Sequence, residues 1–147
     1  MTKLERIIND IAQRLALITI VNGYKTDAGT NVIKEMDVLI EGEQYYLNVA
    51  LGDDNTENQL SANMRLNQPF IIQAYSETPI SNNVPERHKL LSDIKKCLLT
   101  YKKTCNEISN ISYSTKEMVP RQGSEKYAQV NVLFNVQYLE RKGDPDY

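Results

Sequence analysis

The sequence predicts an α+β fold, in which two main helices pack on a mainly antiparallel, or mixed, β-sheet with a long hairpin. Apolar residues recur at helical spacing in two segments and alternate with polar residues in several others. No strand-helix-strand unit repeats along the chain, which disfavours a parallel doubly wound sheet. A length of 147 residues suits a single domain with one hydrophobic core.

Residues 1–23 are predicted to form the first helix. Thr2 and Glu5 have the spacing of a capping box, which satisfies the amides at the first turn of a helix. Gly23 is expected to end the helix. The apolar stripe of this helix is formed by Leu4, Ile7, Ile8, Ile11, Leu15 and Ile18.

Residues 32–76 are predicted to contain a hairpin and a long strand. Apolar and polar residues alternate in residues 36–41 and again in residues 45–51, with Gly42-Glu43 as the turn between them. The polar residues 52–63 are expected to form an exposed loop.

The long strand is expected from Met64 to Ser76, with Pro69 at an edge or a bulge. The residues predicted to share its buried face are Met64, Leu66, Phe70, Ile72 and Ala74.

Residues 85–103 are predicted to form the second helix, with Asn82 or Asn83 as its N-cap and Pro85 in its first turn. Its apolar stripe is formed by Leu90 or Leu91, Ile94, Leu98 and Tyr101.

Residues 110–139 are predicted to form two strands, a short one around Tyr113 and a long one after a loop at residues 120–124. The polar residues 140–147 are expected to be a mobile tail. The buried face of the long strand is predicted to comprise Ala128, Val130, Val132, Phe134, Val136 and Tyr138.

The opposite face of the last strand carries the uncharged amides Gln129, Asn131, Asn135 and Gln137. Exposed strands more often carry charges, which discourage pairing with other chains. Amides offer hydrogen bonds without repelling a neighbour. These four residues are therefore candidates for a contact with another subunit or with a partner protein.

The stretch Asn22–Val32, NGYKTDAGTNV, is predicted to turn the chain from helix to sheet. Thr26 or Asp27 is expected to accept hydrogen bonds from nearby amides, and Gly29 is expected to have a positive φ. Tyr24 is expected to pack its ring on the sheet. Two roles stay open for the stretch: a plain connector, or a subunit interface formed by Tyr24, Lys25, Thr26 and Asp27.

The composition argues against several classes of function. The 17 Lys and Arg residues and 19 Asp and Glu residues give a net charge of -2, which is unlike a dedicated nucleic-acid binder. No apolar run is long enough for a membrane span or a signal peptide. The two cysteines, Cys97 and Cys105, are expected to be reduced thiols. A local cluster of lysines keeps nucleic-acid binding as an alternative: Lys89, Lys95, Lys96, Lys102 and Lys103.

No pattern of catalytic or metal-binding residues is found. His88 is the single histidine and lies between two cations, so neither a catalytic dyad nor a common zinc site can be assembled from it. We therefore predict a non-enzymatic protein with no metal and no cofactor. Four acidic residues are interpreted as surface charges: Asp53, Glu57, Asp93 and Glu107.

Several short motifs, taken in order, resemble the tail terminator or tail-completion proteins of tailed bacteriophages. The stretch from Tyr24 to Val32 follows a leading helix, Asp93-Ile94 lies in the second helix, and Ile111-Ser112-Tyr113 and Tyr138 follow at the expected intervals. Asp144-Pro145 completes the pattern, so that the resemblance spans about Leu4 to Pro145. The strand at residues 45–51 departs from it, because it lacks the proline that often opens the equivalent segment.

The resemblance implies a structural protein of the virion, assembled in the host cytoplasm. Such proteins form a ring, usually hexameric, on the head-proximal end of the tail tube, where they stop growth of the tube and provide the surface for head-tail joining. The implied partners are further copies of the chain, the tail tube protein and the neck or connector proteins, while DNA only passes through the channel. The alternatives are another neck or connector ring protein, or a small enzyme or nucleic-acid module.

Overall fold

The computed structural model describes residues 2–35, 43–52, 55–59, 63–100, 108–121 and 126–146. In chain order, its helices and strands are α1 (Lys3–Leu15), β1 (Val32–Lys34), β2 (Tyr45–Leu51), β3 (Asn55–Gln59), β4 (Asn63–Glu77), α2 (Asn83–Leu99), β5 (Ile108–Val119) and β6 (Tyr127–Arg141). The strands form one six-stranded sheet in the order β1-β2-β4-β6-β5, and β3 pairs with the half of β4 that β2 does not reach.

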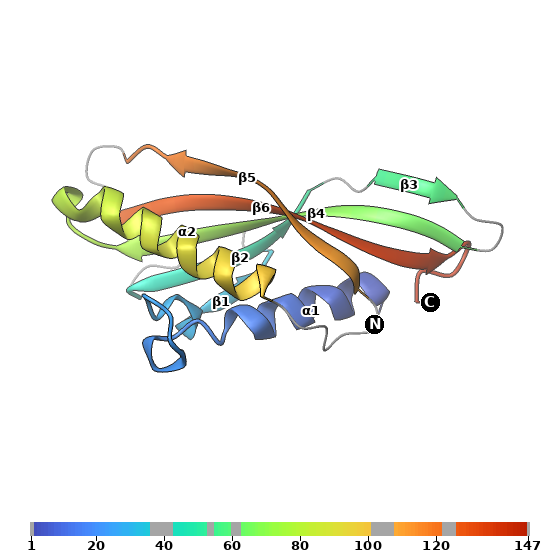
Figure 1. The fold of residues 1–147 in the computed structure, drawn as a ribbon, viewed down its shortest axis with the longest axis horizontal. Coiled ribbons are helices and arrows are strands. Elements are labelled where there is room, and N and C mark those ends of the chain that lie inside the picture. The colour runs from blue at the N-terminus through green and yellow to red at the C-terminus, as the bar shows by residue number, and fades with distance from the viewer. Residues whose placement is uncertain are drawn as a thin grey trace.

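Both helices lie on the same side of this sheet and run in opposite directions (Figure 1). Strands β1 and β2 pair in parallel, and all the other strand pairs are antiparallel. The predicted α+β fold, with two helices on a mainly antiparallel, mixed sheet, is therefore confirmed.

Helix α1 begins as predicted but ends earlier. The amide of Glu5 donates to Oγ1 of Thr2 at 3.2 Å, and the amide of Thr2 donates to Oε2 of Glu5 at 2.6 Å, which completes the capping box. The helix ends at Leu15, so the prediction that it continues to Gly23 is wrong. Gly23 has a φ of 90° and instead ends a short 3₁₀ turn, Ile20–Asn22.

Contacts with later residues explain this early end. Gly29 packs so closely that an added Cβ would lie 2.5 Å from the carbonyl oxygen of Leu15. The amide of Gly29 donates to the carbonyl of Ile18 at 2.8 Å, and Nδ2 of Asn22 donates to the carbonyl of Leu17 at 2.9 Å. These carbonyls would accept from the helix's own amides if α1 continued. Ile18 is nevertheless buried.

Strands β4 and β6 form the centre of the sheet and supply much of the core. They pair along all 15 residues of each strand. On β6 the buried residues are the six that the alternation predicts, from Ala128 to Tyr138. On β4 the predicted face is also buried, except that Met64 is half-buried, and Gln68 and Ser76 share this face.

Pro69 lies where β4 changes partners. Its carbonyl accepts a hydrogen bond from the amide of Gly52 at 3.0 Å, on the side of β4 away from β6. The nitrogen of a strand residue points to the same side as its carbonyl, so the proline nitrogen faces the gap between Leu51 at the end of β2 and Asn55 at the start of β3. At this position no backbone N–H is needed for a hydrogen bond with a neighbouring strand. Pro69 thus lies at the break between two partner strands of β4, β2 and β3, rather than at an outer edge of the sheet.

Two strands differ from their predicted extents. The polar segment predicted to be a loop contains β3, because the outer edge of β4 pairs with it despite its sequence, NTENQ. Strand β5 has 12 residues and is longer than predicted, because β6 offers it a partner along most of its length. Of the predicted hairpin, residues 36–42 lie outside the described residues, and β1 just before them pairs with β2 in parallel.

Helix α2 begins close to its predicted start and buries the predicted stripe, including Leu90, Ile94 and Leu98. The side chain of Asn82 makes no capping hydrogen bond at the N-cap position. It ends a 3₁₀ turn with φ −107° and ψ 11°, and its Nδ2 donates to Oγ1 of Thr78 at 3.5 Å instead. The predicted helical residues 101–103 lie outside the described residues.

The C-terminal residues 142–146 lie against the start of α1, where Figure 1 shows the two ends of the chain close together. The amide of Lys3 donates to the carbonyl of Pro145 at 3.2 Å, and Nη2 of Arg6 donates to the carbonyl of Asp146 at 2.7 Å. The ammonium of Lys3 also donates to the carbonyl of Leu139 at 2.6 Å. The tail was predicted to be mobile, but these contacts place it on the helix, through donors that the polar sequence did not reveal.

Candidate functional site

The amide face consists of Gln129, Asn131, Asn135 and Gln137, which point from β6 to the side of the sheet opposite the helices. All four side chains are half-buried. Directly across on β4 they meet further uncharged residues: Tyr75, Gln73, Pro69 and Asn67. On β6 and β4 the face therefore presents mainly hydrogen-bonding groups without formal charge, whereas β5 places Glu117 beside Asn131.

Hydrogen bonds connect one end of the amide face. Nε2 of Gln129 donates to the hydroxyl of Tyr75 at 3.3 Å and to Oδ1 of Asn131 at 3.1 Å. On the neighbouring strands, Nδ2 of Asn48 donates to Oε1 of Gln73 at 2.7 Å. These bonds fix the orientations of the amides, so this part of the face is ordered before any partner binds.

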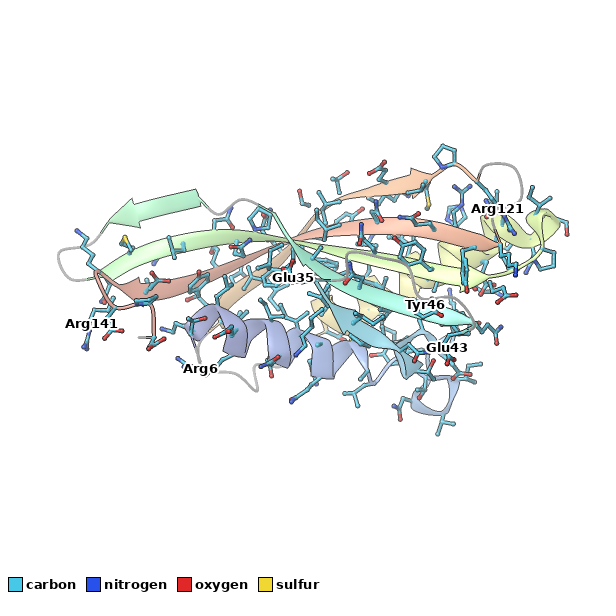
Figure 2. All side chains as sticks on the ribbon, turned by 180° about the vertical axis from the view of Figure 1, so that it is seen from behind. Arg6, Glu35, Glu43, Tyr46, Arg121 and Arg141 are labelled. Atoms are coloured by element: carbon cyan, nitrogen blue, oxygen red, sulfur yellow. The ribbon has the colours of Figure 1, made fainter. Side chains whose placement is uncertain are left out.

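On the same side of the sheet, most of β2 is covered and not accessible to solvent. Tyr46 and Asn48 are each only 1% exposed. The Tyr46 ring packs on Tyr127 with centroids 5.8 Å apart, and its hydroxyl accepts from the amide of Glu43 at 3.0 Å. Figure 2 shows this side, with Tyr46 on β2 and Glu43 beside it. The accessible part of the surface is therefore centred on β6.

The second candidate region, residues 24–27, is held by a buried carboxylate. Asp93 of α2 is 1% exposed, and its Oδ1 accepts from the amide of Lys25 at 3.0 Å. Its Oδ2 accepts from the amide and the hydroxyl of Thr26, at 2.8 and 2.7 Å. We call Asp93, Lys25 and Thr26 the Asp93 anchor. It fixes the turn between helix and sheet to the second helix.

The interpretation of Asp93 as a surface charge is therefore wrong, and its burial is explained by the three donors that it accepts from. The helical spacing could have indicated that Asp93 is buried, because Asp93 lies three residues after Leu90 and four before Cys97, and both of these residues are buried. Glu86, four residues before Leu90, is also buried and accepts from the hydroxyls of Ser76 at 3.0 Å and Tyr45 at 3.3 Å. The core face of α2 thus carries two carboxylates.

Tyr24 packs against α2 rather than on the sheet as predicted. The ammonium of Lys96 lies 4.9 Å from the centre of its ring. Burial raises the pKa of Tyr24 to about 12, and a hydrogen bond with the Cys97 thiol adds to the rise. Burial also raises the pKa of Cys97, which is a free thiol whose Sγ donates to the carbonyl of Arg14 at 3.2 Å. Cys105 lies outside the described residues.

The other residues of the turn differ in detail from prediction. Oγ1 of Thr26 accepts from the amide of Ala28 at 3.3 Å, as expected. Oδ1 of Asp27 instead accepts from the amide of Ile20, seven residues earlier, at 2.8 Å. Gly29 does not have the predicted positive φ. It is required by its close approach to α1, which leaves no space for a Cβ.

The structure does not bring the two predicted interface regions together. Residues 24–27 lie beside α2 on the helical side, whereas the amide face lies on the other side of the sheet. Lys25 has an exposed side chain, Thr26 is buried, and Tyr24 and Asp27 are half-buried. Of these four residues, Lys25 is the most accessible to a partner.

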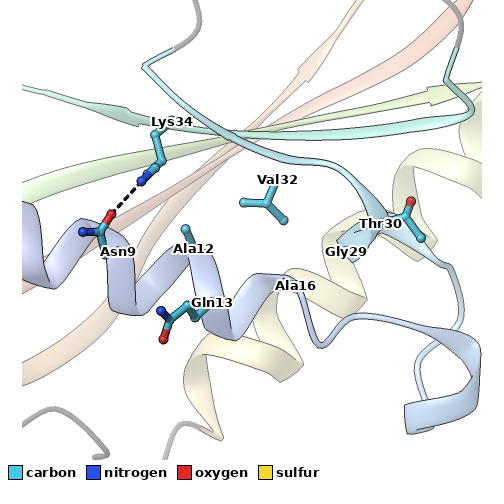
Figure 3. Close-up of a pocket in the computed structure, with 8 residues that line it drawn as sticks. All are labelled: Asn9, Ala12, Gln13, Ala16, Gly29, Thr30, Val32 and Lys34. Atoms are coloured by element: carbon cyan, nitrogen blue, oxygen red, sulfur yellow. Dashed lines mark hydrogen bonds between the residues drawn. The ribbon is translucent and has the colours of Figure 1, made fainter.

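A groove of about 350 Å³ lies between α1 and residues 28–34 (Figure 3). The ammonium of Lys34 donates to Oδ1 of Asn9 at 2.6 Å across it. The lining residues are Asn9, Ala12, Gln13, Ala16, Gly29, Thr30, Val32 and Lys34. This set contains no carboxylate, imidazole or thiol, and hence no acid-base pair and no metal ligands of the usual kinds.

The described part of the chain contains no cluster of three or more His, Cys, Asp or Glu side chains suited to a metal ion. His88 is exposed on α2. None of the helices described is both long enough and apolar enough to cross a bilayer. Asp53, Asp54 and Glu107 lie outside the described residues, as does the side chain of Glu57.

Comparison with known proteins found no protein-family model and no curated protein that matches the chain.

Proposed function

We propose that this protein is a structural component of a bacteriophage tail, a tail terminator that forms a ring at the head-proximal end of the tail tube. The observation that carries the proposal from the structure is the amide face, a hydrogen-bonding surface of uncharged β6 and β4 side chains, ordered at one end, on the side of the sheet that the helices leave uncovered. The order of sequence motifs that resembles tail terminators supports the same role.

The surface chemistry suits a subunit or tube contact. A closed ring uses heterologous interfaces, in which two different patches of one subunit meet. Half-buried amides can pair with another chain without the cost of removing a charge from water. The net charge of -2 also suits a channel through which DNA passes without being held.

The proposed partners are further copies of this chain, the tail tube protein and the neck or connector proteins. In this role the protein has no catalytic function, no cofactor and no metal. It belongs to the virion and is assembled in the cytoplasm of the host. The buried Asp93 anchor has a structural part in this proposal, because it fixes the turn that exposes Lys25.

Growth of tail tubes in the presence of the purified protein tests the proposal. Tube protein that polymerises in vitro is mixed with increasing amounts of this protein, and tube lengths are measured by negative-stain electron microscopy. A terminator shortens the tubes in proportion to its concentration and adds a ring to one end. Unchanged tube lengths at saturating protein would contradict the proposal. Binding to isolated heads that contain a portal, without an effect on tubes, would favour a neck protein instead.

A further inference from the structure

Asn22 and Gly23 form the one Asn-Gly pair in the sequence. Asparagine before glycine is especially prone to spontaneous deamidation, because glycine has no side chain to hinder attack by its own amide nitrogen. Both residues are exposed and lie in the turn after α1. Water can therefore reach the site, and its reactivity depends on the conformation of the turn.

Deamidation exchanges the side-chain amide for a carboxylate without oxidation or reduction. The Gly23 nitrogen gives its proton to solvent base and attacks Cγ of Asn22. An N–Cγ bond forms, the Cγ–Nδ2 bond breaks, and ammonia leaves with a proton from water. Water then adds to one of the two carbonyls of the cyclic imide. Breaking the new N–Cγ bond gives aspartate, whereas breaking the original peptide bond gives isoaspartate, in which the main chain runs through Cγ.

Hydrogen bonds occupy both reacting groups in the folded chain. The amide of Gly23, which would be the nucleophile, donates to the carbonyl of Ile20 at 3.0 Å. Nδ2 of Asn22, which would be the leaving group, donates to the carbonyl of Leu17 at 2.9 Å. Solvent base therefore has to displace the carbonyl of Ile20 before it can remove the proton from Gly23.

The backbone of the turn also keeps the nucleophile away from Cγ. Asn22 ends the 3₁₀ turn Ile20–Asn22, and residues in this conformation have a ψ of roughly −20 to −30°. Cyclisation places Cβ, Cα, the carbonyl carbon and the next nitrogen nearly in one plane, which requires a rotation of roughly 90° about the Cα–C bond. That rotation breaks the hydrogen bond from Gly23 to Ile20. The turn must therefore open before the reaction can occur.

Two side chains from outside the 3₁₀ turn keep it closed. Oδ1 of Asp27 accepts from the amide of Ile20 at 2.8 Å. The ammonium of Lys96, on α2, donates to the carbonyl of Gly23 at 3.1 Å and lies 4.9 Å from the centre of the Tyr24 ring. The packing of α2 beside the turn thus contributes to holding the Asn-Gly pair in its unreactive conformation.

We propose that Asn22 is a deamidation site whose rate is set by opening of this turn, and that the contacts of Asp27 and Lys96 restrain the reaction. The only reactant besides the chain is water. The proposal does not depend on the proposed function.

The isoaspartate product prevents the turn from closing again in its original form. It adds one methylene group to the main chain just before Gly23. In the unmodified turn, the amides of Gly23 and Tyr24 donate to the carbonyls of Ile20 and Thr19, at 3.0 and 3.2 Å. A longer main chain disrupts the spacing of these bonds, and loss of Nδ2 removes the donor to the carbonyl of Leu17.

Peptide mapping by mass spectrometry of the full chain, aged at mildly alkaline pH, tests the proposal. One sample is kept folded and a second is kept unfolded in urea, and the conversion of Asn22 to aspartate and isoaspartate is followed with time. The unfolded chain is expected to react faster at Asn22 than at any other asparagine, and the folded chain at least about tenfold more slowly at Asn22. A smaller difference, or no preferential reaction at Asn22 in urea, would overturn the proposal.

Two variants test the contacts that restrain the reaction. Asp27→Ala and Lys96→Ala are expected to raise the rate in the folded chain about fivefold and about twofold, respectively, and to leave the rate in urea unchanged. Lys116→Ala removes an exposed lysine from β5 and is the matched control, which should react like the unmodified chain.

Circular dichroism establishes that each variant is folded. If Asp27→Ala is not folded, Lys96→Ala decides the test, because Lys96 is exposed. Folded variants that react no faster than Lys116→Ala would overturn the assignment of the restraint to these contacts.

Discussion

The Asp93 anchor and the amide face are both polar regions of one small fold, but they use their hydrogen-bonding groups differently. In the anchor, a carboxylate that is 1% exposed accepts from three donors of the same chain. On the amide face, the side chains are half-buried, and Asn135 has no side-chain hydrogen bond within the described residues. The first region is complete in the monomer, whereas the second retains capacity for a partner.

This difference separates groups that specify the fold from groups suited to recognition. A buried carboxylate that loses a donor is left with an uncompensated charge, so the anchor cannot tolerate change. A half-buried amide can exchange water for a partner at little cost. Substitutions should therefore unfold the protein when they are made around the anchor, and should leave the fold intact when they are made on the amide face.

Gly29→Ala is expected to have the largest effect on stability. The new Cβ would lie 2.5 Å from the carbonyl oxygen of Leu15 and 2.7 Å from that of Ala16, and backbone atoms cannot move aside easily. We expect a loss of about 3 kcal/mol in the free energy of unfolding, measured by urea denaturation. At Gly143, which has a φ of 77° and no atom near a new Cβ, alanine should cost only about 1 kcal/mol. Equal losses at both positions would show that α1 and the turn are not in tight contact.

Asp93→Asn should have the next largest effect. Asparagine retains the shape but has one acceptor oxygen, so either Lys25 or Thr26 would face an amide group with its own donor. The expected loss is about 2 kcal/mol.

Asp27→Asn is a suitable comparison, because within the described residues the Asp27 carboxylate accepts one hydrogen bond, from the amide of Ile20, and is less buried. This variant should therefore lose less than about 1 kcal/mol. Hydrogen exchange at the amides of Lys25 and Thr26 should quicken in Asp93→Asn alone. If Asp93→Asn and Asp27→Asn had the same free energy of unfolding, the Asp93 anchor would contribute no more to stability than the single hydrogen bond of Asp27.

Alkaline pH should weaken the region around Glu86, the second buried carboxylate of α2. Burial raises the pKa of Tyr45 to about 12, and the neighbouring Glu86 adds to the rise. An unfolded tyrosine ionises near pH 10, so the unfolded chain releases this proton first. The stabilisation is complete below about pH 10 and is lost as the pH rises through about 12.

Urea unfolding across this pH range, with tyrosinate absorbance as a second readout, measures this effect. Because Tyr24 also has a pKa of about 12, Tyr45→Phe should remove only part of the pH dependence. If the native protein showed every tyrosine ionising near pH 10, these assignments would be wrong.

The predictions made from the sequence succeeded where a local sequence pattern determines the structure. The buried face of β6 was predictable because alternation along a strand directly records which side meets the core. The start of α1 was predictable because a capping box is local. The end of α1 and the burial of Asp93 were not predicted, because each depends on a partner distant in sequence, Gly29 and Thr26 respectively. The strand β3 was not predicted because its sequence, NTENQ, lacks the alternation of apolar and polar residues, although its partner β4 follows directly in the chain.

The amide face and the turn after α1 divide in the same way. The amide face followed from the two-residue period that also identified the core, so its position opposite the helices was implied by the sequence. The conformation of Leu17, Ile20 and Val21 was not predicted, because the sequence suggested a helix that continues through these residues, whereas α1 ends at Leu15.

Two acidic substitutions on the side of the sheet opposite the helices should give the sharpest contrast, and one of them, Asn135→Asp, should give the smallest change in stability. Asn135→Asp should change the free energy of unfolding by no more than about 0.5 kcal/mol, because the new charge stays hydrated. Asn48→Asp should cost more than about 2 kcal/mol, since Asn48 is 1% exposed and donates to Gln73. If the amide face contacts the tube or another subunit, Asn135→Asp should reduce tube capping while the isolated protein remains fully folded by circular dichroism. Normal capping by a folded Asn135→Asp protein would remove this part of the amide face from the interface.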